Sequence, residues 1–437
     1  MAEENKKIVV GLDIGTSKVC AIIGTKNEYG KVEILGMGKT ESLGVIRGEV
    51  RNIDKTIKSI NEAIDRAKKS LEANNIKIEI NYVHVGIAGQ HIKSKQHRNS
   101  ISRNNPEDLI TRDEIEKFIN ETKKVALPPG DEIIHVIPQE YQVDDFADVT
   151  DPAGIAGVRM SANFHIITGN VDAIKSIYRC VRSSGLEVDD LILEPLSSAE
   201  SVLTPEEMEA GVCLVDIGGG TSDVAIFKNG IIRHTAVIPF GGNIITDDIV
   251  EGCQVLRNQA ELLKIKFGSA VADENKDNEI VCIPGFHGRA PKEVSVKNLA
   301  MVIQARVEEI FESVLFQIKS SGLERKLNAG IVISGGGAQL KHLSKLVEYV
   351  TGMDTRIGYP NEHIAKSAIE EIKSPMYATG VGLVIKGLNG FETTKEETNK
   401  QEQQNIDTNI QKSNGLLSKL LEKGKSWLND GDDIKDF

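Results

Sequence analysis

The stretch GVCLVDIGGGTSDVAIF, residues 211–227, decides the fold because it repeats a pattern found near the start of the chain. In both places an apolar strand leads into Asp-Ile-Gly, at residues 13–15 and again at residues 216–218, 203 positions later. A turn rich in small and hydroxyl residues follows, and a second apolar strand runs back. Two strand–turn–strand units of this kind predict two related domains, each built around an antiparallel hairpin.

Both turns have the chemistry that a polyphosphate needs. Glycines let successive backbone N–H groups approach closely, hydroxyls add donors, and a lysine adds a positive charge. The residues predicted to bind the nucleotide and its magnesium ion are Asp13, Gly15, Thr16, Ser17, Lys18, Asp216, Gly218, Gly219, Gly220, Thr221 and Ser222. Because carboxylates repel phosphate oxygens, we expect Asp13 and Asp216 to act through a Mg²⁺ ion that keeps its waters.

A single Asp-Ile-Gly is equally consistent with an ordinary strand and turn, since short motifs often match by chance. The second copy favours nucleotide binding, and so does a third glycine cluster, Gly335–Gly337, after another apolar strand. That cluster suits close backbone approach to a flat base and a ribose.

The three glycine clusters, in this order, resemble the phosphate 1, phosphate 2 and adenosine motifs of the ATPase superfamily of actin, Hsp70 chaperones and sugar kinases. Further segments resemble the bacterial cell-division FtsA family, from Lys7 to about Gly387. They are EPLSSAESVLTPEE at 194–207, VIPFGGNIITDDI at 237–249, QAELLKIKFG at 259–268, ARVEEIFE at 305–312, ISGGGAQL at 333–340 and PMYATGVGL at 375–383. The resemblance implies an α/β, actin-like fold of duplicated RNase H-like domains, with two large domains around a nucleotide cleft.

The resemblance also implies where each large domain carries a smaller subdomain. The expected boundaries are 1–88 and 162–200 for the first large domain, 89–161 for an inserted α+β subdomain, 201–240 and 325–390 for the second large domain, 241–324 for its subdomain, 391–414 for a flexible linker, 415–428 for an amphipathic helix and 429–437 for an acidic tail. The linker is predicted from its composition, because it has too few apolar residues to form a core.

ATP and Mg²⁺ are the cofactors that the resemblance implies. Glu194 matches a carboxylate that orients an attacking water, although it could simply begin a helix. Gly241 and Gly242 would pass near the phosphates, and Glu261 and Lys264 would reach the ribose and base. Lys264 could instead be a solvated helix lysine. We expect at most a slow ATPase.

Composition restricts the class of protein further. The 437 residues include 52 Lys and Arg against 64 Asp and Glu, a formal net charge of −12. This balance argues against a protein that coats nucleic acid, although a local basic patch remains possible. The five cysteines are far apart and form no CxxC pair, as expected in a reducing compartment. The chain has no signal-peptide pattern and no apolar run of 18 residues, so we expect a cytoplasmic protein.

The segment 415–428 has the pattern of a basic amphipathic helix. Its apolar side chains, which fall on one face of a helical plot, are Leu416, Leu417, Leu420, Leu421, Trp427 and Leu428. Lysines flank this face, and a tryptophan suits a membrane interface. The helix could instead dock on the globular body or on a partner. The acidic tail after it would be repelled by anionic lipid.

The resemblance implies a tether at the cytoplasmic face of the membrane, at the division septum. Its expected partners are the C-terminal peptide of the tubulin-like protein FtsZ, further copies of the chain in a filament, other division proteins and membrane lipid. Lys297 and Arg306 are the candidates for meeting the acidic peptide, although Arg306 could instead pair with Glu309 or Glu312 along its own helix. The alternatives are a pilus-assembly platform protein and a small-molecule kinase of the same superfamily.

Overall fold

The computed structural model describes residues 7–285, 290–361, 363–365 and 369–390. The chain divides into two units, Met1–Gly387 and Leu388–Phe437, and the fold below is that of the first unit. The predicted linker, amphipathic helix and acidic tail lie outside the described residues.

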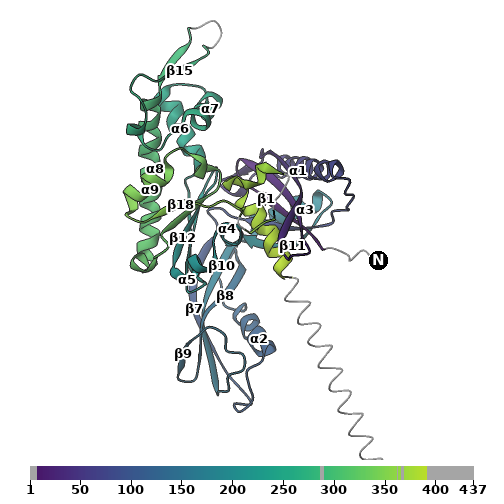
Figure 1. Ribbon diagram of the computed structural model, residues 1–437. Helices are drawn as coiled ribbons and strands as arrows, with labels where there is room; N and C mark the ends of the chain where they lie inside the picture. Colours follow the sequence, from purple (N-terminus) through teal and green to yellow (C-terminus); the bar gives the residue numbers. More distant parts are fainter. Residues whose placement is uncertain (1–6, 286–289, 362, 366–368, 391–437) are drawn as a thin grey trace, which may run out of the picture. The chain divides into compact units, whose positions relative to one another are not determined.

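The first domain is a five-stranded sheet in the order β11-β6-β1-β2-β3. The first predicted hairpin is formed by β1 (Ile8–Ile14) and β2 (Lys18–Lys26), and β3 (Val32–Glu41) extends it into an antiparallel meander. Strands β6 (Tyr82–Ile87) and β11 (Glu187–Leu193) continue the sheet in parallel on the other side of β1. Helices α1 (Ile53–Ala73) and α3 (Val171–Ser183) pack together beside this sheet (Figure 1). A small hairpin, β4 (Val45–Ile46) and β5 (Glu49–Val50), precedes α1.

The second domain repeats this sheet. Its order, β14-β13-β12-β17-β18, again places three antiparallel strands beside two parallel ones. These strands are β12 (Val212–Ile217), β13 (Ser222–Lys228), β14 (Ile231–Ile238), β17 (Ile331–Ser334) and β18 (Thr355–Ile357). The predicted duplicated α/β fold is therefore confirmed.

Two helices join the two domains. Helix α4 (Glu194–Val202) follows β11 and contacts strands of both sheets, and α5 (Pro205–Ala210) leads into β12. Residues 378–387 are helical and pack closely on α4, since a Cβ at Gly382 would lie 1.7 Å from the Ser197 carbonyl oxygen. Only glycine allows this approach.

The inserted subdomain is a four-stranded sheet in the order β7-β10-β8-β9, with one helix (Figure 1). The strands are β7 (Lys93–Ser102), β8 (Asp131–Val143), β9 (Phe146–Val149) and β10 (Arg159–Asn170). The predicted capping box between Thr111 and Glu114 begins α2 (Arg112–Thr122), whose Phe118 meets Phe164 edge-on at 5.3 Å. Strand β10 runs directly into α3, so the expected boundary at residues 161 and 162 falls inside a strand.

The second domain carries its own helical group. It comprises α6 (Gly242–Cys253), α7 (Arg257–Phe267), α8 (Val296–Ser320), α9 (Leu343–Thr351), the hairpin of β15 (Ile280–Ile283) and β16 (Lys292–Ser295), and the short turns η1 (Ala272–Glu274), η2 (Glu324–Lys326), η3 (Gly336–Gln339), η4 (Glu370–Lys373) and η5 (Pro375–Tyr377). Helix α6 ends at Gln254, which has φ 49° and separates it from α7. Among the described residues, no helix is both long and apolar enough to cross a membrane.

Candidate nucleotide site

The two Asp-Ile-Gly turns have the same backbone geometry. In the first, the Gly15 N–H donates to the Lys18 carbonyl oxygen at 3.0 Å, and in the second the Gly218 N–H donates to that of Thr221 at 2.9 Å. Each aspartate pairs across its hairpin with the residue seven positions later, Cys20 in the first copy and Asp223 in the second. The two hairpins that share a sequence pattern therefore also share the same strand pairing.

The two turns face each other directly. A Cβ added at Gly219 would lie 3.0 Å from Ser17 Oγ, and one at Gly220 would lie 2.8 Å from Thr16 Oγ1. The Thr16 hydroxyl also accepts a hydrogen bond from the Gly48 N–H at 2.9 Å. A side chain at Gly219 or Gly220 would therefore push the second turn away from the first.

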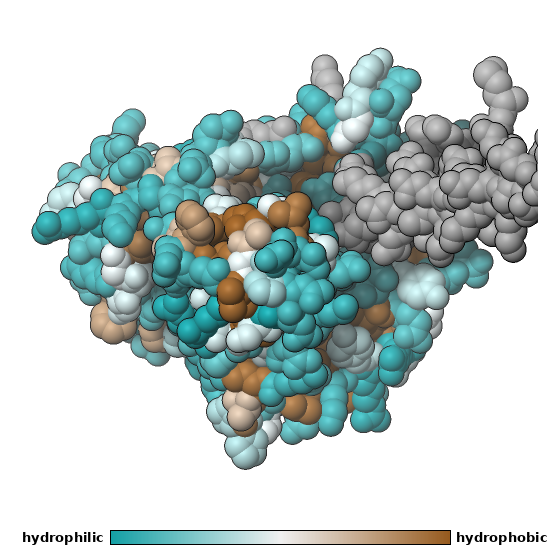
Figure 2. All heavy atoms as spheres, turned by 90° about the horizontal axis from the view of Figure 1, so that it is seen from below, coloured by the Kyte–Doolittle hydropathy of each residue, from teal (hydrophilic) through white to brown (hydrophobic). Residues whose placement is uncertain are grey.

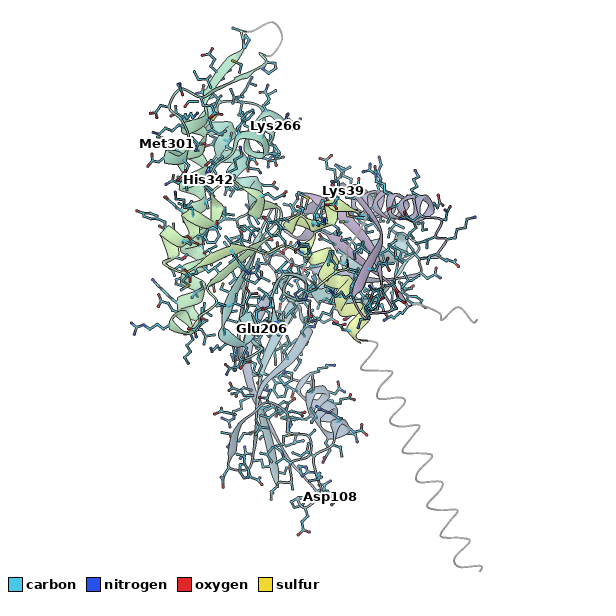
Figure 3. All side chains as sticks on the ribbon, in the orientation of Figure 1. Lys39, Asp108, Glu206, Lys266, Met301 and His342 are labelled. Carbon is cyan, nitrogen blue, oxygen red and sulfur yellow. The ribbon has the colours of Figure 1, made fainter. Side chains whose placement is uncertain are left out.

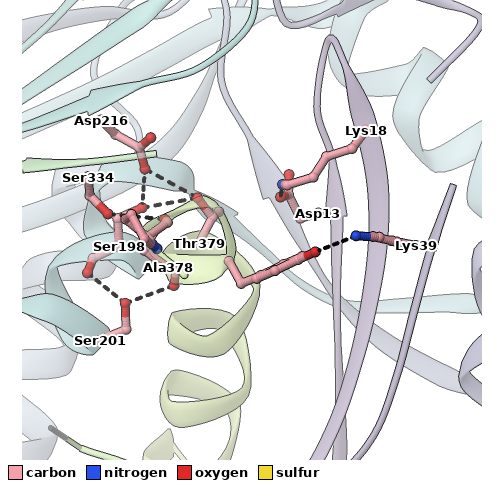
Figure 4. A network of polar contacts seen from close by, with 11 residues as sticks. Asp13, Lys18, Lys39, Ser198, Ser201, Asp216, Ser334, Ala378 and Thr379 are labelled. Atoms are coloured by element: carbon pink, nitrogen blue, oxygen red, sulfur yellow. Dashed lines mark hydrogen bonds and ion pairs between the residues drawn. The ribbon is translucent and has the colours of Figure 1, made fainter. Parts of the chain in front are cut away.

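On the first domain, Asp13 and Lys18 form an ion pair at the mouth of the hairpin (Figure 4). Burial alone would lower the pKa of Lys18, but the Asp13 carboxylate more than offsets this, so the pKa lies above its usual value. Lys18 Nζ also lies 5.9 Å from the ring centroid of buried Tyr377, and Lys39 Nζ lies 5.8 Å from it. Lys39 is a cation near the first hairpin that the sequence did not single out.

On the second domain, Asp216 is held by hydroxyl donors. Ser198 Oγ donates to its Oδ2 at 2.5 Å and Thr379 Oγ1 at 3.3 Å, and Ser198 and Thr379 also contact each other (Figure 4). Burial raises the pKa of Asp216 despite these bonds. Through Ser201, which donates to the Ser198 and Ala378 carbonyl oxygens, the network ties β12 to α4 and to the helix at 378–387.

Glu194 begins α4 and shares this electrostatic environment. Burial, and then the negative charges of Asp13, Asp223 and Asp216, raise the pKa of Glu194 well above its usual value. Its carboxylate has no hydrogen-bond or ion-pair partner among the described residues. A carboxylate that is poised between both hairpins and left unpaired is suited to orient a water molecule.

Asp223 is a buried carboxylate that the sequence analysis missed. Thr221 Oγ1 donates to its Oδ2 at 3.1 Å, but Oδ1 is buried without a partner. Burial and the charge of Asp216 raise the pKa of Asp223 to about 7. An acidic residue inside the apolar strand SDVAIF was the available signal.

The chemistry of this donor set fits a hydrated magnesium ion. Asp13, Glu194, Asp216 and Asp223 are carboxyl groups near one another, and Lys18 is the cation among them. Burial, and then repulsion from neighbouring carboxylates, raises the pKa values of Glu194, Asp216 and Asp223, and a divalent cation would relieve the repulsion. Among the described residues, no group of three or more His, Cys, Asp or Glu side chains is arranged to hold a metal ion directly.

Gly241 and Gly242 pack against the second turn. A Cβ at Gly241 would lie 2.7 Å from the Gly218 carbonyl oxygen, and that oxygen accepts from the Gly242 N–H at 2.9 Å. Lys264 Nζ donates to the Gly242 carbonyl oxygen at 2.8 Å and to Glu261 Oε2 at 2.8 Å. Burial, opposed by Glu261, lowers the pKa of Lys264. The structure therefore places Lys264 and Glu261 beside Gly242 and the second turn, and Lys264 is not a solvated lysine.

The third glycine cluster divides into two kinds of position. Cβ atoms at Gly335 and Gly337 would lie 2.3 Å from Asp216 Oδ1 and 2.4 Å from Ile217 Cγ2. A Cβ at Gly336 would meet nothing within 4 Å. Gly335 and Gly337 are thus needed by the fold itself, whereas Gly336 borders open space.

Comparisons with known proteins show the family of the chain. A family model described as "Cell division protein FtsA" matches residues 213–382, and one described as "SHS2 domain inserted in FTSA" matches residues 89–168. The cell division protein FtsA of Pseudomonas aeruginosa is 40% identical over 385 residues, which cover 88% of this chain and 90% of that protein. The chain belongs to the FtsA family of cell division proteins. FtsA of Escherichia coli K12 is 34% identical over 422 residues, covering 95% of this chain and 98% of that protein.

The actin-like architecture of this FtsA family member also has a solved counterpart. A chain of the "PilM-PilN type IV pilus biogenesis complex" matches with a TM-score of 0.64, over 87% of this chain and 98% of that chain. The sequence identity is 14%, so the likeness is one of fold alone.

The two residues predicted to meet the FtsZ peptide lie on α8, in the helical group rather than with the two hairpins. Arg306 binds both carboxylate oxygens of Asp248 on α6, at 2.5 and 2.8 Å, and also pairs with Glu309. Lys297 Nζ lies 2.7 Å from Asp277 Oδ1. Both cations therefore have partners within the fold, and an acidic peptide would have to compete for them.

We expect Asp223→Asn to raise the thermal stability of the nucleotide-free FtsA family member at alkaline pH. The raised pKa means that the native state keeps a proton that the unfolded chain releases, so stability falls as pH rises from about 4 to about 7. A pKa of about 7 in place of the ordinary 3.8 corresponds to on the order of 4 kcal/mol of lost stability above pH 7. Asparagine cannot ionise, so its gain in melting temperature over the parent should grow between pH 4.5 and pH 8.

Thermal unfolding of both proteins across this pH range measures the effect. Asp65→Asn, at an exposed position of α1, is the control and should leave the pH dependence unchanged. A gain for Asp223→Asn that is the same at every pH would show that Asp223 is ionised throughout.

Proposed function

We propose that this chain binds ATP with Mg²⁺ between its two hairpins, polymerises, and tethers the FtsZ division ring to the cytoplasmic face of the membrane. The observation that carries the proposal is the pair of hairpins with equal register whose turns meet, Thr16 and Ser17 against Gly219 and Gly220. Each domain would supply phosphate donors from one side, so a bound nucleotide would hold the two domains together.

The nucleotide would be held by groups of different kinds. Backbone N–H groups and hydroxyls of the two turns suit phosphate oxygens, and Lys18 adds a charge. Magnesium would neutralise phosphate and carboxylate charge together, with Asp13 and Asp216 binding its water molecules. The open space at Gly336 suits the adenosine. Glu194 would orient water for a slow hydrolysis.

Polymerisation would use the inserted subdomain, in contact with a neighbouring protomer. Asp108 lies at the end of this subdomain far from the two large sheets (Figure 3). In the same subdomain, Leu109, Phe146 and Val158 are exposed by 59%, 70% and 55%. Seen from below, the molecule shows hydrophobic residues scattered among mainly hydrophilic ones (Figure 2). Exposed apolar side chains of this size favour contact with another protein surface.

Arg306→Glu is expected to weaken binding of an FtsZ C-terminal peptide about tenfold, because it replaces an attractive charge with a repulsive one. Asp248→Asn is the informative partner variant. It releases Arg306 from the carboxylate that holds it at both oxygens, so it should strengthen peptide binding. Fluorescence anisotropy of a labelled peptide at two salt concentrations measures both effects, and the parent affinity should fall with salt.

Binding of ATP provides the control for these two variants and should be unchanged in both. Equal peptide binding by Arg306→Glu and the parent would place the FtsZ site elsewhere. Weaker binding by Asp248→Asn would mean that the Asp248 pairing holds the site in shape.

Membrane attachment is proposed for residues 415–428, which lie outside the described residues, and it rests on the sequence alone. One interfacial helix binds lipid only marginally, whereas a filament carries many copies at high effective concentration. Polymerisation and attachment would therefore depend on each other.

We expect Trp427→Glu to reduce co-sedimentation with anionic vesicles at least about tenfold, since it places a charge on the apolar face. The measurement uses the full chain with ATP at moderate salt. The control lacks residues 429–437 and should bind as well as the full chain or better, because it loses four aspartates. If the full chain fails to sediment with the vesicles, the tether proposal fails and the docked-helix alternative replaces it.

A further inference from the structure

The turn that presents Glu194 has little support from its own segment. Leu193 is the N-cap residue of α4, with φ −58° and ψ 126°, and it makes no side-chain capping bond. Pro195 follows Glu194 and restricts the backbone. A Cβ at Gly86 would lie 3.1 Å from Glu194 Cγ, so β6 leaves room for the side chain without holding it by a hydrogen bond. The position of Glu194 therefore depends on how the end of β11 is fixed.

The end of β11 is fixed by a residue of the inserted subdomain. Strand β11 is at the edge of its sheet and pairs with β6 on one side. The Leu193 N–H donates a hydrogen bond to His135 Nε2 at 3.0 Å. His135 lies on β8, 58 positions earlier in the chain. Leu193 is buried, so without this acceptor its N–H would be left unsatisfied next to Glu194.

The protonation state of the His135 imidazole allows it to accept this hydrogen bond. Burial, and then the charge of Lys386, lower the pKa of His135 to about 4. The ring is therefore neutral at pH 7, and Nε2 can accept while Nδ1 carries the proton.

The same strand also contacts the second domain. Gln139 Nε2 donates to the Ile232 carbonyl oxygen on β14 at 2.6 Å, and Glu140 forms an ion pair with Arg233. Strand β8 thus contacts both large domains, through His135 at the end of β11 and through Gln139 and Glu140 at β14. A change in the tilt of the inserted subdomain would move β8 and with it the bond to Leu193.

We infer that His135 is a positioning residue for Glu194, and that the inserted subdomain sets the rate of ATP turnover through this bond. The inference rests on the proposed ATP binding. It predicts that a partner or a neighbouring protomer that tilts the subdomain changes turnover without touching the nucleotide.

The test compares steady-state ATP turnover and ATP affinity of full-length variants. His135→Phe removes the acceptor, and His135→Asn shortens the side chain so that it cannot reach Leu193. Each should lower kcat about tenfold and leave ATP affinity within about twofold, because small misplacements of a catalytic group act on the chemical step. His135→Gln can still place an acceptor oxygen near Leu193 and should restore most of kcat.

Two controls separate positioning from general destabilisation. His84→Gln alters a histidine that also contacts β11, through Asp189 at 3.1 Å, and should leave kcat unchanged. In a Glu194→Ala background, His135→Phe should cause no further loss, because residues that act through one another are not additive.

Parent-like kcat in the folded Asn variant would overturn the inference, as would equal losses from His135→Phe with and without Glu194. A parent that binds ATP but does not hydrolyse it would also overturn the inference, while leaving the proposed ATP binding intact. A parent that does not bind ATP would overturn both.

Discussion

Gly336→Arg is expected to lower the affinity for ATP at least about 100-fold, equivalent to about 2.7 kcal/mol, while the protein stays folded. The reason is the difference among the three glycines of the cluster. Gly336 is exposed and borders open space, so its larger replacement meets no protein atom at the Cβ. The arginine side chain would instead fill the space proposed for the adenosine.

Calorimetric titration with Mg-ATP and a thermal melt of the same sample test this expectation. Ser320→Arg, at the exposed end of α8, adds the same charge far from the hairpins in sequence and should bind ATP normally. Gly337→Ala tests a position that the fold itself needs. Its Cβ would overlap Ile217, so this variant should have a lower melting temperature. Full ATP affinity in folded Gly336→Arg would remove the adenosine site from this cluster.

The sequence predicted the duplicated sheets because apolar strands and turn residues are local signals. Asp13 and Asp216 lie near the ends of buried strands, and the glycines after them permit the tight turns and the close backbone approach that other residues would hinder. The meander, the hairpins and the capping box of α2 were therefore accessible from neighbouring residues alone.

Strand β7 was missed because it has almost no apolar residues. Its sequence, KSKQHRNSIS, pairs with β10 along its whole length, yet it lacks the alternation that marks a half-buried strand. Residues 93–102 form a strand because the tertiary fold supplies hydrogen-bond partners for them. Gln96, for example, contacts His165 and the Arg233 carbonyl oxygen.

The contacts that tune the candidate site were also beyond the sequence. Arg306 and Asp248 are 58 residues apart, as are His135 and Leu193, and no spacing rule connects such positions. The side chains themselves were visible, but which of them meet depends on how α6 lies against α8 and β8 against β11. For the same reason, the role of Asp223 became apparent only when its strand was paired with Asp216.

Glu194→Gln is expected to lower ATP turnover about 100-fold and to leave ATP affinity equal or higher. The fall in turnover follows from losing the carboxylate that would orient water and take its proton. The effect on affinity has the opposite sign, because glutamine cannot ionise in a site where burial and the charges of Asp13, Asp223 and Asp216 already disfavour a negative Glu194 and where a polyphosphate must bind. Glu200→Gln on the same helix, which loses a contact to Lys386, is the matched control and should alter neither quantity. Single-turnover hydrolysis and equilibrium binding separate the two effects. If both fell together, Glu194 would serve the fold or the binding of ATP rather than the attack of water.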